Sequence, residues 1–270
     1  MSYRDRAVIV GLVAVTLGVT PACAEEAAQK PGWLQPGEKA GQEITGPDSV
    51  PYVWVPAGEF TMGSDTGFGS EQKPAHQIRI TKGFWIRKCE VTNAQYAAFC
   101  NAVGHAMPRG SYQAANHPVV FVSWEDATAY CQHFGTTLPT EAQWEYAARG
   151  PESRRYPWGD TWDPTRCCHY GAKGPGGWSQ PAGSFLTGAS WCGALDMAGN
   201  VYEWCADFFD PSYYRTSPTD DPPGPPEGTR RAVRGGAWTS DDYHCRCAVR
   251  SSDMPTQTVS YIGFRCIVVP

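Results

Sequence analysis

Eleven cysteines occur in this 270-residue chain, and ten of them fall between residues 89 and 266. The ten are at positions 89, 100, 131, 167, 168, 192, 205, 245, 247 and 266. In a chain exported to an oxidising compartment, an even number of cysteines indicates disulfide bonds before metal ligands or free thiols. We therefore expect a disulfide-rich domain, although the sequence alone does not determine which cysteines pair.

The N-terminus predicts such an export. Arg4 and Arg6 precede an apolar stretch over residues 7–19, and Ala22-Cys23-Ala24 follows it. A basic start, a short apolar segment and an end with small residues are typical of a secretory signal. We expect residues 1–24 to be a signal peptide cleaved after Ala24, and the protein to be periplasmic or secreted. Two alternatives remain open, a buried core helix and a lipoprotein signal acylated at Cys23.

Composition excludes several classes of protein. Only 18% of the residues are charged and 13% are aromatic, which argues against disorder for most of the chain. A formal net charge of -5 argues against nucleic acid as the partner, because phosphate binding needs clustered Lys and Arg. No apolar run is long enough to predict a membrane span.

The chain divides into a tether and one domain. Residues 25–50 are rich in Glu, Lys, Gly, Pro and Gln, which predicts a flexible tether after the signal. Residues 51–270 show no internal repeat and no break in composition, so we expect a single domain there. From Gly150 onward glycine, proline and tryptophan dominate, which predicts short strands among long loops rather than long helices.

Several regular elements are expected within that domain. Thr92-Asn93 predicts the start of a helix with Tyr96, Phe99 and Val103 on one face, and Thr140-x-x-Gln143 is a capping box for another helix. A further helix is expected from Ser123 to Phe134. Strands are expected at residues 52–56, 84–91, 118–122, 231–234 and 264–268, and an exposed loop at residues 218–228.

Eight stretches resemble the formylglycine-generating enzyme family, also called sulfatase-modifying factor, and they occur in the family's order. They are residues 55–64 (VPAGEFTMGS), 90–96 (EVTNAQY), 122–127 (VSWEDA), 138–146 (LPTEAQWEY), 156–159 (YPWG), 196–204 (DMAGNVYEW), 234–236 (RGG) and 263–266 (GFRC). The resemblance implies an α+β fold, a single C-type-lectin-like domain with little regular secondary structure. It also implies an oxidoreductase that acts on a peptide or peptide-derived substrate.

Active members of the family oxidise a substrate cysteine to formylglycine with oxygen and with copper held by a cysteine pair. In this chain the two cysteine positions fall on or near Ser240 and near Asp242, in a segment that is about three residues short. The family's Ser after the glycines is Ala237, and its Asn before Gly-Phe-Arg is Tyr261. We therefore do not expect formylglycine formation by the usual site. Similar periplasmic members serve in siderophore maturation without the pair, so its loss does not exclude catalysis.

His244, Cys245 and Cys247 are the remaining candidate catalytic residues. Thiolates select Cu(I), so these three residues are candidates for a displaced copper site. The alternative is that each cysteine bridges elsewhere, since side chains two residues apart on a strand seldom bond to each other. By the resemblance Cys131 pairs with Cys266, and the expected partner position of Cys247 is occupied by Ala148.

A calcium site is also implied by the resemblance. Its ligands would be the carboxylates of Asp196 and Glu203 and the carbonyls of Gly199 and Val201, a set of hard oxygen donors that suits Ca²⁺. The alternative is that the two acids cap turns by binding backbone amides. Trp178 and Trp191, in a glycine-rich region, are candidates for contact with a partner.

Two functions remain open. The first is an exported, oxygen-dependent oxidoreductase that matures a peptide or peptide-derived substrate through a modified site. The second is a non-catalytic, lectin-like binding or accessory module that holds a peptide, glycan or partner protein. In either case we expect a monomer.

Overall fold

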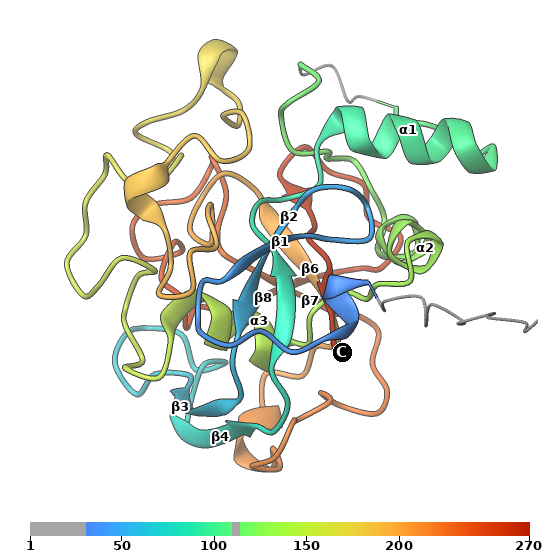
Figure 1. Ribbon diagram of the computed structural model, residues 1–270. Helices are drawn as coiled ribbons and strands as arrows, with labels where there is room; N and C mark the ends of the chain where they lie inside the picture. Colours follow the sequence, from blue (N-terminus) through green and yellow to red (C-terminus); the bar gives the residue numbers. More distant parts are fainter. Residues whose placement is uncertain (1–30, 110–113) are drawn as a thin grey trace, which may run out of the picture. The chain divides into compact units, whose positions relative to one another are not determined.

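The computed structural model describes residues 31–109 and 114–270 (Figure 1). The predicted signal at residues 1–24, including Cys23, lies outside the described residues. The fold class is confirmed: the described chain combines three α-helices with short strands and long loops. In these two ranges no helix is long and apolar enough to cross a bilayer.

Three sheets form the framework. The first has the order β1 (Glu43–Thr45), β2 (Pro51–Val55), β5 (Phe84–Arg87) and β10 (Ile267–Val268), all antiparallel, which joins the two ends of the described domain. The second is a hairpin of β3 (Gly58–Met62) and β4 (His76–Ile80). The third has the order β8 (Ser251–Asp253), β7 (Arg231–Arg234), β6 (Tyr202–Phe208) and β9 (Ile262–Gly263), with β6 and β9 parallel.

Each α-helix begins at a capping box, as the sequence predicts for the helix after Thr140. The helices are α1 (Asn93–Val103), α2 (Trp124–His133) and α3 (Glu141–Arg149), with N-caps at Thr92, Ser123 and Thr140. Each cap hydroxyl accepts the N3 backbone N–H, and the N3 side chain accepts the cap's own N–H. Single 3-10 turns lie at Gly32–Leu34, Pro175–Gly177, Leu186–Gly188 and Tyr213–Arg215.

Two hydrophobic clusters hold the helices. One surrounds α3 and includes Phe60, Ile78 and Trp144, while the other joins α1 and α2 to the third sheet through Tyr130 and Trp204. In Figure 1, α1 and α2 lie at one edge of the domain, away from the β3–β4 hairpin against which α3 packs.

The expected tether is shorter in the structure. β1 lies inside the range 25–50 and pairs with β2, while Trp33 and Ile44 pack against the cluster of Tyr52, Trp54 and Trp85. These two apolar side chains order a segment whose polar composition predicts flexibility. Residues 25–30 lie outside the described part of the chain.

Other parts of the chain also differ from the sequence predictions. Residues 118–122 are mostly buried but form no strand, because Phe121 has a φ of 60° and interrupts the extended backbone. The strands expected at 84–91 and 264–268 are confirmed only at 84–87 and 267–268. Val103 is 47% exposed, because it is the last residue of α1 and lies next to the Gly104 cap.

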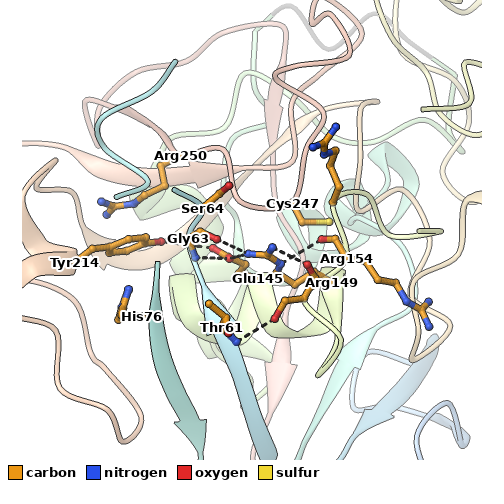
Figure 2. Close-up of polar contacts among 12 residues, drawn as sticks. Thr61, Gly63, Ser64, His76, Glu145, Arg149, Arg154, Tyr214, Cys247 and Arg250 are labelled. Atoms are coloured by element: carbon orange, nitrogen blue, oxygen red, sulfur yellow. Dashed lines mark hydrogen bonds and ion pairs between the residues drawn. The ribbon is translucent and has the colours of Figure 1, made fainter. Parts of the chain in front are cut away.

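A buried network of charges joins α3 to the end of β7 and to the segment that follows it. Figure 2 shows one of its contacts, the Glu145–Arg149 pair. The Arg234 guanidinium donates to Glu145 at 2.5 Å, to Glu141 at 3.0 Å and to the Cys247 carbonyl at 2.6 Å. Arg250 binds both Glu141 oxygens, at 2.8 and 2.7 Å, and Arg149 binds Glu145 at 2.7 Å. Since these groups are removed from water, each charge depends on its partner for stabilisation.

Arg234→Met therefore leaves two buried carboxylates with one fewer cation. We expect it to lower the free energy of unfolding by about 3–5 kcal/mol, measured by urea denaturation. The matched control is Arg79→Met, because Arg79 pairs with Asp220 at the surface, where the two side chains are 51% and 48% exposed. That control should cost less than about 1 kcal/mol, and equal losses in the two variants would contradict the network's role.

Asp207 is a buried acid that accepts the Glu141 backbone N–H at the start of α3, at 2.8 Å. Burial and the charge of Glu141 raise the pKa of Asp207 to about 7, against the hydrogen bond. The folded state therefore holds this proton more tightly than the unfolded state, so the stability contributed by protonation is lost as pH rises from about 4 to 7.

Asp207→Asn removes this titration and keeps an acceptor for the helix. We expect the fall in unfolding free energy between pH 4 and 7 to become smaller in the variant by an amount on the order of 4 kcal/mol, measured by urea denaturation across that range. Identical slopes in the two proteins would contradict the assignment.

Candidate functional site

The loop after β7 starts with two glycines in left-handed conformations. Gly235 has a φ of 96° and Gly236 a φ of 74°, and a Cβ on Gly236 would lie 2.8 Å from the His244 carbonyl oxygen. Only glycine allows the chain to turn here with such close backbone approach. The turn directs residues 237–245 into a compact loop, in which Ala237 N–H donates to the Ser240 hydroxyl at 2.9 Å.

A surface hollow of about 320 Å³ lies over this loop. It is lined by polar and aromatic side chains, namely Tyr170, Tyr202, Thr239, Ser240, Asp241 and His244. Ser240 is the residue on or near which the resemblance places the first family cysteine. The hollow therefore combines hydroxyl, phenol, carboxylate and imidazole groups at the position where the family resemblance predicts catalysis.

His244 and Asp241 form a hydrogen-bonded pair at one side of the hollow. Asp241 Oδ1 lies 2.6 Å from His244 Nδ1 and accepts the His244 backbone N–H at 3.0 Å. Partial burial acts to raise the pKa of Asp241, but the hydrogen bonds from His244 hold it below its usual value. Because an ionised carboxylate only accepts, Nδ1 carries a proton, and Nε2 of a neutral His244 is available as a base.

Tyr202 supplies a phenol to the same hollow. Its hydroxyl lies 3.5 Å from the Ser240 hydroxyl, and burial raises the pKa of the phenol, so Tyr202 is a neutral hydrogen-bond donor at physiological pH. Tyr261, at the position of the family's Asn, has its ring 6.3 Å from that of Tyr202. Sequence reasoning did not select Tyr202 or Asp241, since neither stands in a spacing that marks an acid–base group.

Aromatic side chains form a rim near the hollow. The Lys173 ammonium lies 4.4 Å from the centre of the Tyr170 ring and 5.4 Å from that of Trp238. Trp178 is 41% exposed and lies against Trp238, with ring centres 5.2 Å apart. Trp191 is instead packed against the core and donates its indole N–H to the Tyr146 carbonyl. Of the two tryptophans expected to contact a partner, only Trp178 is at the surface.

The structure does not bring His244, Cys245 and Cys247 together. His244 faces Asp241 at the surface, Cys245 is buried against Cys167, and Cys247 is in the core beside the Glu145–Arg149 pair (Figure 2). A hydrogen bond with Cys167 and burial raise the pKa of Cys245 well above its usual value, and burial raises that of Cys247 to about 12. The three side chains have separate partners, and in the described ranges no group of three or more His, Cys, Asp or Glu side chains is arranged to hold a metal, so the arrangement does not fit the displaced copper site.

Other cysteines lie close enough to pair. The Sγ atoms of Cys131 and Cys266 are 3.2 Å apart between α2 and the last strand, and Cys245 makes a side-chain hydrogen bond with Cys167. The ten cysteines of the described ranges carry free thiols here, so the disulfide bonds stay a prediction. Cys131 and Cys266 are the two cysteines that the resemblance implies for a bridge.

The acids of the predicted calcium site lie in a buried cluster. Asp196 Oδ2 accepts the Gly183 N–H at 2.5 Å, while its Oδ1 is buried without a hydrogen-bond partner. Glu203 is held by Arg265, with contacts of 2.6 Å to both oxygens, and by the Trp144 indole at 2.8 Å. Asp196 therefore keeps one carboxylate oxygen that could bind a cation. Both oxygens of Glu203 already accept hydrogen bonds, from the Arg265 guanidinium and the Trp144 indole.

Glu90 is a third acid in this cluster, and sequence reasoning missed it. It is fully buried, accepts the Asn200 amide at 2.9 Å through Oε1, and leaves Oε2 buried without a partner. Burial and the nearby charge of Asp196 raise the pKa of Glu90 well above its usual value. In the described ranges no group of three or more His, Cys, Asp or Glu side chains is arranged to hold a metal, so backbone carbonyls would have to complete any site.

Comparison with known proteins agrees with this fold. Residues 40–269 match the family model described as a sulfatase-modifying factor enzyme 1-like domain. A formylglycine-generating enzyme from Streptomyces coelicolor is 37% identical in an alignment 276 positions long, which covers 79% of this chain and 88% of that protein. PvdO from Pseudomonas aeruginosa, a solved structure, has a TM-score of 0.76 at 26% identity and covers 87% of this chain and 100% of its own.

Treponema denticola variable protein 1 shares the fold, with a TM-score of 0.70 at 21% identity over 85% of this chain and 99% of its own. Together the architecture and these structures define a C-type-lectin-like domain of the formylglycine-generating type. The chain belongs to the sulfatase-modifying factor, or formylglycine-generating enzyme, family.

Proposed function

We propose that the protein is an exported, oxidoreductase-like maturation factor that acts on a peptide or peptide-derived substrate in the hollow beside His244. The observation that carries this proposal is the His244–Asp241 pair, which lines a 320 Å³ hollow together with Tyr202. A base oriented by a carboxylate, next to a neutral donor, is the arrangement that proton abstraction requires. The rim formed by Tyr170, Trp178 and Trp238 would contact the peptide.

In the proposed reaction the substrate loses two electrons and two protons, and O₂ accepts them to form H₂O₂. His244 Nε2 takes the first proton, and Asp241 stabilises the imidazolium that forms. The second hydrogen leaves the substrate with the electron pair, and the imidazolium returns the first proton to the reduced oxygen, which completes H₂O₂ and restores the base. Tyr202 donates a hydrogen bond to the negative charge that develops on the substrate. Because His244, Cys245 and Cys247 do not converge, no step passes through copper.

The second candidate is a non-catalytic binding module in the same compartment. It is favoured by the exposure of the site, since the His244 and Asp241 side chains are 50% and 61% exposed and water is not excluded from them. Such a module would bind peptides in the same hollow without consuming oxygen. Turnover therefore separates the two functions, whereas binding does not.

The proposed chemistry is tested by His244→Gln with a synthetic peptide library that contains cysteine, serine and tyrosine. We expect peptides to drive O₂ consumption and H₂O₂ release by the wild-type protein, and the variant to lose about 10²–10⁴-fold in rate with unchanged peptide affinity. The control is His133→Gln, an exposed histidine on α2 that lies outside the hollow. Peptide binding without O₂ consumption would instead establish the binding module.

We also propose that the cluster around Asp196 binds a structural Ca²⁺. Support comes from Asp196 Oδ1 and Glu90 Oε2, two buried carboxyl oxygens that accept no N–H from the surrounding chain and belong to one cluster with Glu203. With the carbonyls of Gly199 and Val201 they would offer the oxygen donors that Ca²⁺ prefers. Bound there, the ion would neutralise buried charge and hold an irregular backbone.

Calcium binding is tested by thermal unfolding in EDTA and in Ca²⁺ at a saturating concentration. We expect Ca²⁺ to raise the Tm of the wild-type protein by roughly 5 °C and to have little effect on Asp196→Asn. The control is Asp163→Asn, which removes a partly exposed acid that pairs with Arg166. An unchanged Tm in the wild-type protein would show that the acids only hold backbone amides and Arg265.

A further inference from the structure

A second hollow, of about 340 Å³, is lined by arginines. It lies between the loop after β3, the loop after α3 and residues 246–248, and its polar lining includes Ser64, Thr66, Arg149, Arg155, Arg246 and Asp160. Three arginines and one acid therefore face one cavity in a chain whose formal net charge is -5. This concentration of cationic groups favours an anion as the occupant.

Arg149 forms a fixed wall of this cavity (Figure 2). Its guanidinium donates to the Gly63 carbonyl at 2.7 Å, to Glu145 at 2.7 Å, to the Ser153 carbonyl at 2.8 Å and to the Arg154 carbonyl at 3.2 Å. Because Glu145 neutralises this charge and carbonyls occupy its donors, Arg149 shapes the cavity rather than supplying its free charge.

Arg246 does supply such a charge. It is 9% exposed, and its Nη2 is buried without a hydrogen-bond partner in the described part of the chain. The guanidinium lies 3.9 Å from the centre of the Tyr243 ring, and its Nε donates to the Tyr243 carbonyl at 3.2 Å. Its Nη2 lies against the backbone of Gly67, while the residue lines the hollow, so Arg246 contributes a buried positive charge to the wall rather than an open Nη2 donor.

Arg155 has a backbone fixed by two hydrogen bonds and an exposed side chain. Its N–H donates to Asp160 Oδ1 at 2.9 Å, and its carbonyl accepts the Cys247 N–H at 2.9 Å. Within residues 31–109 and 114–270 its guanidinium has no ion pair. Asp160 binds the Arg155 backbone through Oδ1 and makes no ion pair with its side chain in those ranges, so the Arg155 guanidinium is available to a ligand.

We propose that this hollow is a binding site for a phosphate group, independent of the site beside His244. Guanidinium groups present paired N–H donors that match phosphate oxygens. The Ser64 hydroxyl donates to the Thr66 carbonyl at 3.1 Å, so the hydroxyl of Thr66 is the further donor that this loop offers. A tetrahedral anion with several acceptor oxygens uses such a set more fully than a planar carboxylate does. The cavity has about ten times the volume of one water in the liquid, which leaves room for an organic group attached to the phosphate.

The test is calorimetric titration of the full-length protein with inorganic phosphate and, separately, with glucose 6-phosphate, at constant ionic strength. We expect saturable binding at one site and about a tenfold weaker affinity in Arg246→Gln. Arg155→Gln should weaken binding in the same direction, and because Arg155 is exposed this variant tests the site even where Arg246→Gln disturbs folding. Tighter binding of glucose 6-phosphate would assign the site to phosphate esters, whereas equal affinity would assign it to the free ion.

The control is Arg215→Gln, which removes the same charge at an exposed position outside the cavity. We expect wild-type affinity in this variant, and competition by sulfate but not by acetate. The proposal is overturned if the wild-type protein shows no saturable binding. It is also overturned if Arg215→Gln and Arg155→Gln weaken binding equally, or if sulfate and acetate compete equally, because binding would then depend only on the overall charge of the protein.

Discussion

The buried contact of Arg234 with Glu141 and Glu145 is the interaction on which both functional regions depend. It connects α3, whose start is capped by Thr140, to the end of β7, and the same guanidinium binds the Cys247 carbonyl. The chain between Arg234 and Cys247 is therefore anchored at both ends by one side chain. Because these charges are inaccessible to water, the geometry is set by complementarity of donors and acceptors rather than by apolar packing alone.

Both hollows are lined by the segment that this anchor holds. Gly235 and Gly236 turn the chain so that Asp241 and His244 face one hollow, and two residues later Arg246 lines the other. The candidate acid–base pair and the proposed phosphate site thus share a short, irregular stretch of backbone. Such stretches vary in side chains while the surrounding sheets and helices keep their positions.

Much of the fold was predictable because its signals are local. The cap at Thr140 and the short strand at residues 231–234 depend on residues adjacent in sequence, and both were found where expected. The order of residues 31–50 was not predictable, since it comes from Trp33 and Ile44 packing against distant aromatic residues. The absence of a strand at residues 118–122 likewise depends on the positive φ of Phe121, which composition does not report.

The sequence by itself determined the family and the fold class, because these depend on motifs in a defined order. Only the tertiary structure decided how the candidate residues are used. It separates His244 from Cys245 and Cys247, adds Glu90 to Asp196, and places Arg155 and Arg246 in one cavity. The physical reason is that a side chain's chemistry depends on burial and on partners far away in the chain, and neighbouring residues can point to opposite sides of the same backbone.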